Sequence, residues 1–371
     1  MGDIRLDAGI ELAERIERLD RAGALFPLPG VAPGDRDRRA RGFALLLRNV
    51  RFELLRQREY AALDRLLERM AARARVIGDH DLAELARLLL RHNRWLTGRF
   101  EHTDDLLAGA ASSGTWAALD DVFSSFYANT LGWFSESMRR LRRVEQASAA
   151  QRRAAEFFVG LDLRLACAAW KFWNRGELSD YAGMHTDSGF LDDVCGRRYP
   201  GAGQSRAQLL LAAGTFYLHH RNYALADRYL TGSFEASSGT GSRLYPRIAS
   251  ALALCRHHQG DAPASAAYFT AASAGLPEHF GPTGWQLRLV AYQRMLGDTE
   301  GALGHARRIR AETEAKHEVV HNIWARIYEL DLLNELHTSS VAAWRLLDEA
   351  ASRQMSRACA FIVERQRLAP A

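Results

Sequence analysis

Apolar residues recur along this chain three and four positions apart, which is the spacing of one face of an α-helix. The segments with this pattern come in pairs separated by short polar breaks, as at 43–57 and 60–77 and again at 205–220 and 223–236. No segment shows a convincing alternation of apolar and polar residues, as a half-buried strand would. The pattern therefore predicts an all-α protein of antiparallel helix hairpins with no significant β-sheet.

Proline and glycine divide the chain into parts. Pro27, Pro29 and Pro33 remove backbone donors and fix φ, so residues 26–35 are expected to connect a first helix at 3–22 to the main body. Residues 174–204 contain six glycines and one proline, which is longer than an ordinary loop. The expected parts are 1–37 (N-terminal helix and Pro-rich connector), 38–174 (N-terminal lobe of helix hairpins), 175–204 (irregular joint) and 205–371 (C-terminal lobe).

Further helices are expected throughout both lobes. In the N-terminal lobe they are 81–96, 101–111, 115–131 with Thr115 as N-cap, 134–146, and one long apolar helix at 151–173. In the C-terminal lobe they are 243–259, 262–274, 284–296, 298–314, 317–336 and 339–367.

One hairpin pattern is repeated within residues 208–277 and again, more weakly, beyond them. The three copies are Leu210-x2-Ala213-Gly214-x2-Tyr217 with Ala226, Ala249-x2-Leu252-Ala253-x2-Arg256 with Ser265, and Gln286-x2-Leu289-Val290-x2-Gln293 with Ala302. In each copy the small residue of the second helix follows the last motif position of the first helix by nine positions, and the breaks at 221–223, 259–261 and 296–298 are expected to be equivalent turns. The copies lie 39 and 37 residues apart, counted from 217 to 256 and from 256 to 293.

This pattern resembles the tetratricopeptide repeat, in which small residues let two helices approach and aromatic residues fill the gaps beside them. The resemblance covers residues 205–350, and more loosely 40–147, although the repeats are longer than the usual ~34 residues. It implies a right-handed α-solenoid of stacked hairpins that acts as a non-enzymatic adaptor or regulatory scaffold, with a protein or peptide held in a concave groove lined by the first helix of each hairpin.

The resemblance and helical phase together give a set of groove residues that mixes apolar and basic character. They are Gln208, Leu211, Thr215, Leu218, Arg247, Ser250, Leu254, His257, Arg288, Ala291 and Arg294. The lysine and asparagine clamp that some of these proteins use for acidic C-terminal tails is not reproduced, since Leu211, Thr215 and Ala251 stand in its place. Three of the groove arginines, at 247, 288 and 294, suit a carboxylate or phosphate because a guanidinium offers a fork of donors.

A second hypothesis comes from the string His317-Glu318-Val319-Val320-His321, an H-E-x-x-H match. On a helix the two histidines share a face and can both bind Zn²⁺, while the glutamate acts as general base on a bound water. No third ligand is indicated, and no adjacent sheet is predicted to hold a peptide substrate. We therefore expect a protein that is not an enzyme and has no cofactor, with a zinc-dependent hydrolase as one alternative and a regulator that senses a small ligand or peptide as another.

Two further groups of side chains have structural and functional interpretations. The pairs His219-His220 and His257-His258 occupy similar places in neighbouring hairpins, where they suit either a metal site or the negative end of a helix dipole. The basic run Met138–Arg143, continued by arginines at 152 and 153, is expected to be a solvated helix face, and whether it contacts an acidic partner stays open.

Composition narrows the compartment and the class of partner. Of the 49 basic residues only Lys171 and Lys316 are lysines, an imbalance typical of a GC-rich bacterial genome, and 44 acidic residues nearly balance the charge, so we do not expect nucleic acid as a partner. Four widely spaced cysteines indicate a reduced, cytoplasmic protein. No apolar run approaches the ~20 residues of a membrane span. Nothing in the sequence indicates the oligomeric state.

Overall fold

The computed structural model describes residues 33–57, 59–76, 78–99, 114–178, 190–191, 203–237, 244–274 and 283–336. Within these residues the chain forms 14 α-helices and two short 3-10 helices, and no strand. The all-α prediction is therefore confirmed. The predicted helices at 3–22, 101–111 and 339–367 lie outside the described residues.

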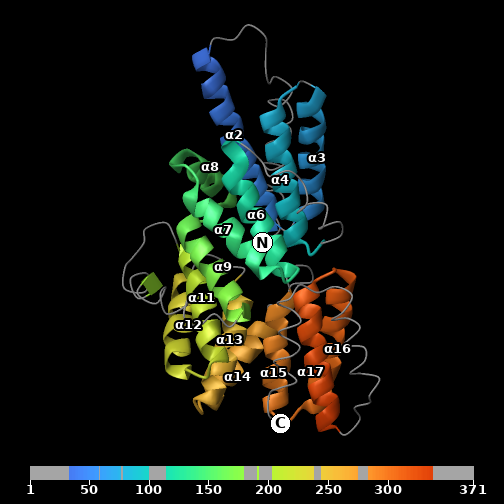
Figure 1. Ribbon diagram of the computed structural model, residues 1–371. Coiled ribbons are helices and arrows are strands. Elements are labelled where there is room, and N and C mark those ends of the chain that lie inside the picture. The colour runs from blue at the N-terminus through green and yellow to red at the C-terminus, as the bar shows by residue number, and fades with distance from the viewer. Residues whose placement is uncertain are drawn as a thin grey trace, which may run out of the picture.

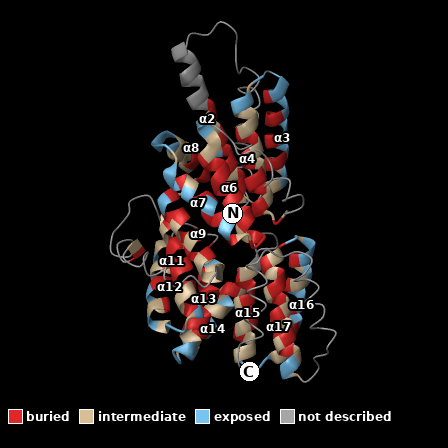
Figure 2. Cartoon of the chain, in the orientation of Figure 1, coloured by how far each residue is buried: buried red, intermediate tan, exposed pale blue. Residues whose placement is uncertain are grey.

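The first half of the chain, here called the N-terminal lobe, forms the upper part of the molecule in Figure 1. Its elements are α2 (Pro33–Gln57), α3 (Tyr60–Val76), α4 (His80–Leu96), the 3-10 helix η1 (Gly114–Trp116), α6 (Ala117–Thr130), α7 (Phe134–Gln146), α8 (Ala149–Val159) and α9 (Leu163–Leu178). Aromatic rings join α4, α6 and α9 in one core, in which the Phe126 ring centroid lies 4.6 Å from that of Trp170 and 5.1 Å from that of Trp95. Buried residues follow the faces on which these helices meet (Figure 2).

The second half, the C-terminal lobe, is a stack of antiparallel hairpins below the first (Figure 1). Its elements are α11 (Gly203–His219), α12 (Tyr223–Ser237), α13 (Tyr245–His258), α14 (Ala262–Ala274), the 3-10 helix η2 (Thr283–Gln286), α15 (Leu287–Met295), α16 (Thr299–Ala315) and α17 (Val319–Glu335). The predicted hairpins 205–236, 243–274 and 284–314 agree with these bounds to within a few residues. The right-handedness of the stack stays a prediction.

The two helices of several hairpins are joined by one recurring turn. A three-residue link follows the first helix, its middle residue has a positive φ, and the N–H of its third residue bonds to the carbonyl five positions back, as from Asp261 N to Arg256 O at 3.0 Å. Glycine suits the middle position because it has no Cβ to clash in the left-handed region, and Gly260 and Gly297 both have φ of 81° there. Arg221 and His317 adopt the same conformation, each with φ of 58°.

The turns also give the repeat its length. Their middle residues at 221, 260 and 297 are 39 and 37 residues apart (260 − 221 and 297 − 260), which are the repeat lengths found in the sequence. The predicted alignment was one residue late in the first hairpin, where the equivalent turn is 220–222 rather than 221–223.

Close contacts between paired helices recur as well. In three helix pairs a side chain of the second helix donates to the backbone carbonyl 12 residues earlier, on the first helix. These bonds are Ser137 Oγ to Ser125 O at 2.9 Å, Ser265 Oγ to Ala253 O at 2.7 Å, and Asn322 Nδ2 to Arg310 O at 3.0 Å. At Gly214 the helices approach so closely that an added Cβ would lie 2.6 Å from Leu230 Cγ. The small residue in the repeat pattern is thus required by the distance between α11 and α12.

The predicted helix at 151–173 is wrong, because the structure divides it into α8 and α9. Gly160 ends α8 with φ of 73°, and a capping box between Ser148 and Gln151 begins it. The two arginines of α2 nearest this end donate to its last carbonyls, Arg48 Nε to Phe157 O at 2.8 Å and Arg51 to Phe158 O. These carbonyls have no partner within the helix, and a positive charge is favourable at a helix C-terminus.

Two other predicted helix starts differ. α2 begins at Pro33, inside the region predicted to be a connector, and proline is well tolerated in the first turn of a helix because its missing N–H needs no acceptor there. α6 is preceded by a 3-10 turn, and its N-cap is Trp116 rather than Thr115.

The two lobes touch at both sides of the molecule. α9 packs against α11, and at the other side the turn between α16 and α17 returns to the N-terminal lobe. There Val319 packs against the N-terminal core, and the Lys316 side chain covers Gly98 so closely that a Cβ on residue 98 would lie 2.7 Å from Lys316 Cδ. None of the described helices is both long and apolar enough to cross a membrane.

Candidate functional site

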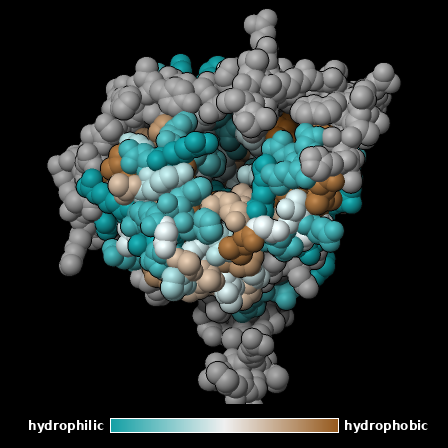
Figure 3. All heavy atoms as spheres, turned by 90° about the horizontal axis from the view of Figure 1, so that it is seen from below, coloured by the Kyte–Doolittle hydropathy of each residue, from teal (hydrophilic) through white to brown (hydrophobic). Residues whose placement is uncertain are grey.

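The first helices of the hairpins and α17 form one layer of the C-terminal lobe, here called the inner layer. α11, α13, α15 and α17 contact one another in this order, while α12, α14 and α16 pack against their own hairpin partners. Seen from below, the described surface is hollowed near its centre between two mostly hydrophilic flanks (Figure 3). All the residues predicted to line a groove lie on α11, α13 or α15.

Arg288 of α15 reaches across the inner layer to both neighbouring hairpins. Its Nη1 lies 3.4 Å from the backbone oxygen of Arg247 and 3.3 Å from Ser250 Oγ, both on α13, and its Nη2 lies 3.4 Å from Thr215 Oγ1 on α11. Residues as far as 73 positions apart in the chain therefore meet at one place. We call these four residues, all expected from helical phase to face the groove, the arginine recess.

The two guanidinium groups of the recess are poorly hydrated. Burial lowers the pKa of Arg247 to about 10, opposed by the negative charge of Glu318. Burial likewise lowers the pKa of Arg288 to about 10, helped by the like charge of Arg247 and opposed by Tyr328. Both residues are partly exposed. Both stay positively charged at neutral pH.

Arg294, the third predicted groove arginine, has its charge compensated. It bonds to Glu335 Oε1 through Nε at 2.6 Å and lies 3.6 Å from Asp331 Oδ2, and both acids belong to α17. Burial raises the pKa of Asp331, opposed by Arg294. Arg294 thus joins α15 to α17.

The remaining predicted groove residues fall into two groups. Leu211, Leu218 and Leu254 are at most 8% exposed and belong to the hydrophobic core of the lobe. Gln208, Ala291 and His257 are partly exposed, and the His257 ring lies 5.8 Å from that of Tyr292. The leucines therefore support the layer, while the polar residues remain accessible.

The H-E-x-x-H string does not have the geometry of a helical zinc site. His317 is the exposed middle residue of the α16–α17 turn, and α17 begins only at Val319, after Glu318. Two histidines four residues apart bind one metal when a single helix spans both, and here a helix starts between them. Among the described residues, no three His, Cys, Asp or Glu side chains are grouped to hold a metal ion.

Glu318 and His321 interact with each other instead. The Glu318 side chain is fully buried, and its Oε2 lies 2.9 Å from His321 Nδ1. Gly284 of η2 packs against the same imidazole, where a Cβ would lie 2.2 Å from the ring. These contacts fix the start of α17 against η2, and from there the negative charge of Glu318 acts on Arg247.

The histidine pairs pack against aromatic rings. His220 lies 4.2 Å from Phe216, and His258 stacks on Tyr223 of the preceding hairpin with centroids 4.5 Å apart. Burial lowers the pKa of His258, which favours its neutral form. Such packing supports the structural interpretation of these pairs.

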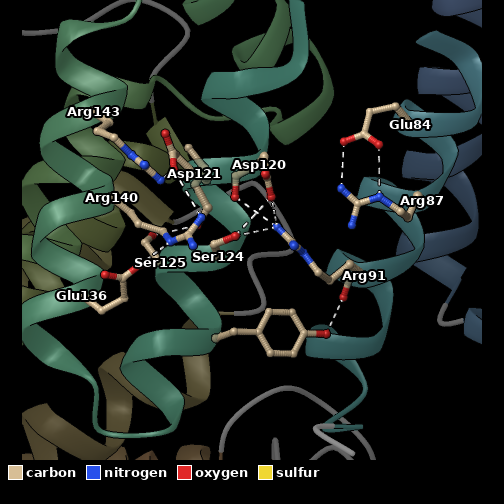
Figure 4. A network of polar contacts seen from close by, with 12 residues as sticks. Glu84, Arg87, Arg91, Asp120, Asp121, Ser124, Ser125, Glu136, Arg140 and Arg143 are labelled. Atoms are coloured by element: carbon tan, nitrogen blue, oxygen red, sulfur yellow. Dashed lines mark hydrogen bonds and ion pairs between the residues drawn. The ribbon is translucent and has the colours of Figure 1, made fainter. Parts of the chain in front are cut away.

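The arginines of the N-terminal lobe form a polar network between α4, α6 and α7 (Figure 4). Arg91 is 3% exposed and bonds to the carboxylate of Asp120 and, at 2.7 Å, to Ser124 Oγ. Burial lowers the pKa of Arg91, opposed by Asp120. This buried cation has a carboxylate partner.

The basic run 138–143 is part of the same network. Arg139 and Arg140 both bind Glu136, at 2.6 and 2.7 Å, and Arg143 binds Asp121. Arg140 is itself buried, so it does not belong to the solvated face that the sequence predicted. Of the four arginines in the run, at 139, 140, 142 and 143, three therefore form intramolecular ion pairs.

Tyr328 and Glu318 are the residues near the recess that were not predicted to face the groove. Both act electrostatically on its arginines, Tyr328 from α17 and Glu318 from the residue before that helix. Extending the helical phase of the groove to the predicted helix 317–336 would have found Tyr328. Comparison of the chain with family models, curated proteins and solved structures found no match.

Proposed function

We propose that this protein is a non-enzymatic, tetratricopeptide-repeat-like scaffold that binds a protein or peptide partner on its inner layer and acts as a cytoplasmic adaptor or regulator. The observation that supports this most is the arginine recess, where Arg288 brings together polar groups from three hairpins. Stacked hairpins provide a continuous surface on which an extended chain contacts several repeats at once. The recess provides a polar anchor within it.

The polar content of the recess suits recognition better than it suits stability. Ser250 is fully buried and Thr215 is 4% exposed, in positions where apolar residues would pack without needing hydrogen-bond partners. Binding sites commonly combine a mainly apolar surround with a few convergent polar groups that fix the orientation of the ligand. The buried leucines at 211, 218 and 254 support the layer that carries these polar groups.

The proposal is tested by photo-crosslinking in cells that make the full chain. A benzophenone amino acid replaces Gln208 or His257, partly exposed residues of the inner layer, and in a matched control it replaces Ala266, an exposed residue of α14. We expect both inner-layer positions to trap the same protein partner, identified by mass spectrometry, and position 266 to trap none of it. Equal adducts at all three positions, or none at the inner layer, would refute the proposal.

A further inference from the structure

The charge of Arg288 is less compensated than the charges of Arg91, Arg140 and Arg294. Arg91, Arg140 and Arg294 each form an ion pair with at least one carboxylate. Among the described residues none offers a carboxylate to Arg288, and the groups that act on its charge are Arg247 and Tyr328, one of like sign and one neutral at pH 7. The partners of its amino groups are a carbonyl and two hydroxyls.

Those partners use the donors of Arg288 weakly. The three contacts measure 3.3 to 3.4 Å, whereas charge-assisted bonds to carboxylates or phosphates are ~2.7–2.9 Å long. A guanidinium has five N–H donors in a planar fork, which matches the two oxygens of an oxyanion. Arg288 thus keeps its capacity to bind one more strong acceptor.

A cation in this position works against the stability of the unliganded fold. It is partly withdrawn from water beside a second cation, and a charge withdrawn from water without an opposite charge is costly. Residues that oppose stability in this way occur mainly at functional sites, where a ligand supplies the missing interaction. The missing interaction at Arg288 is with a negative charge.

We propose that Arg288, flanked by the hydroxyls of Ser250 and Thr215, is a subsite for an oxyanion, and that its ligand is a carboxylate of an acidic peptide segment. This rests on the proposed function, because the inner layer must then be the surface that binds the peptide. Arg247 adds to the positive potential from the neighbouring helix. Ser250 Oγ donates to the backbone oxygen of Arg247 at 2.8 Å and accepts from Arg288, so it orients the guanidinium rather than donating to the ligand. A phosphate group would satisfy the same donors.

Isothermal titration of the full chain with inorganic phosphate tests the subsite at low ionic strength. We expect the wild type to bind, and Arg288→Met to bind about 10- to 100-fold more weakly, the effect of losing a hydrogen bond to a charged group. Arg288→Lys should bind at an intermediate level, since it keeps the charge but loses the fork. Arg308→Met, on an exposed residue of α16, is the matched control and should bind as the wild type does.

Thermal unfolding without added anion separates this role from a structural one. If Arg288 is kept for a ligand, Arg288→Met unfolds at the same temperature as the wild type or higher, because an uncompensated charge has been removed. A structural role predicts a lower temperature. Loss of stability in Arg288→Met, or phosphate affinity equal to that of the wild type, overturns the subsite.

Two peptides then identify the source of the oxyanion. One alternates serine and glutamate over eight residues, and the other has glutamine in place of glutamate. Tighter binding of the acidic peptide, lost in Arg288→Met, supports the proposal in full. If phosphate binds and the two peptides bind equally, the peptide carboxylate is refuted and the subsite belongs to a small anion. If phosphate does not bind although the inner layer captures a partner by crosslinking, the subsite is refuted and the proposed function stands.

Discussion

His305, on the buried face of α16, should make the stability of the C-terminal lobe sensitive to acid. It is 8% exposed, its Nδ1 lies 3.1 Å from Gln293 Oε1 on α15, and no described group accepts from its Nε2. An amide oxygen only accepts hydrogen bonds, so Nδ1 carries the proton of the neutral ring, and a second proton on Nε2 would have no acceptor. Burial, with the positive charge of Arg308 adding to it, lowers the pKa of His305 from 6.5 to about 4.

The sign and size of the effect follow from linkage. Because the pKa is lowered on folding, the folded state favours the neutral ring, and the stability from His305 is fully present above pH 6.5 and is lost as the pH falls toward 4. A pKa difference of 6.5 − 4, at ~1.36 kcal/mol for each unit, corresponds to about 3 kcal/mol in total, of which about 2 kcal/mol is lost by pH 5.

Urea unfolding at several pH values, followed by tryptophan fluorescence, measures this loss. Other groups also titrate, so the informative quantity is the difference in unfolding free energy between the wild type and His305→Gln, which has no titrating ring. The unfolding free energy of the wild type minus that of His305→Gln should be constant above pH 7 and fall by about 2 kcal/mol by pH 5. Arg308→Gln should make the loss at pH 5 smaller, since it removes a charge that lowers the pKa of His305 in the folded state. Parallel curves for the wild type and His305→Gln between pH 7 and 4.5 would refute the reasoning.

Three other single substitutions test the packing of the two lobes. Arg91→Met should lower the unfolding free energy by about 3–5 kcal/mol, because Asp120 then stays buried without its cation, and adding Asp120→Leu should restore most of the loss; additive losses in urea titrations would contradict this. Gly214→Ala should destabilise the chain by about 1–3 kcal/mol through its clash with Leu230. Gly304→Ala, where a Cβ meets nothing within 4 Å, should instead stabilise it by up to ~1 kcal/mol through helix propensity, and a thermal melt distinguishes the two.

The sequence predicted the helix hairpins well because their information is local. Apolar periodicity marks each helix, and Gly260 and Gly297 mark the turns through their need for a positive φ. The turn between α16 and α17 was predicted too early, with a helix starting at 317 instead of 319, because a histidine with positive φ is uncommon and the string around His317 suggested helix. The break at Gly160 was also missed, because a single glycine within an apolar run is ambiguous between an interior residue and a C-cap.

The candidate site was only partly predictable. Helical phase placed Thr215, Ser250 and Arg288 on the layer where they meet, because positions on one helix face can be computed from the sequence. Arg294 has carboxylate partners, whereas none of the described carboxylates pairs with Arg288, and this difference depends on how α17 lies against α15. Such pairing between helices far apart in the chain leaves no mark in either segment alone.

The contact of the α16–α17 turn with the N-terminal lobe has a consequence for the elasticity of the molecule. In a stack with a free end, small rotations at each interface between repeats add up, and the whole stack can bend. Here Lys316 and Val319, at the α16–α17 turn, contact the N-terminal lobe, which also packs against α11 of the first hairpin. Because both ends of the stack are held, the rotations at its interfaces must sum to a constant. If the angle between one pair of neighbouring hairpins widens, the angle between another pair must narrow. Movements of α13 and α15 around a ligand should accordingly be correlated rather than independent.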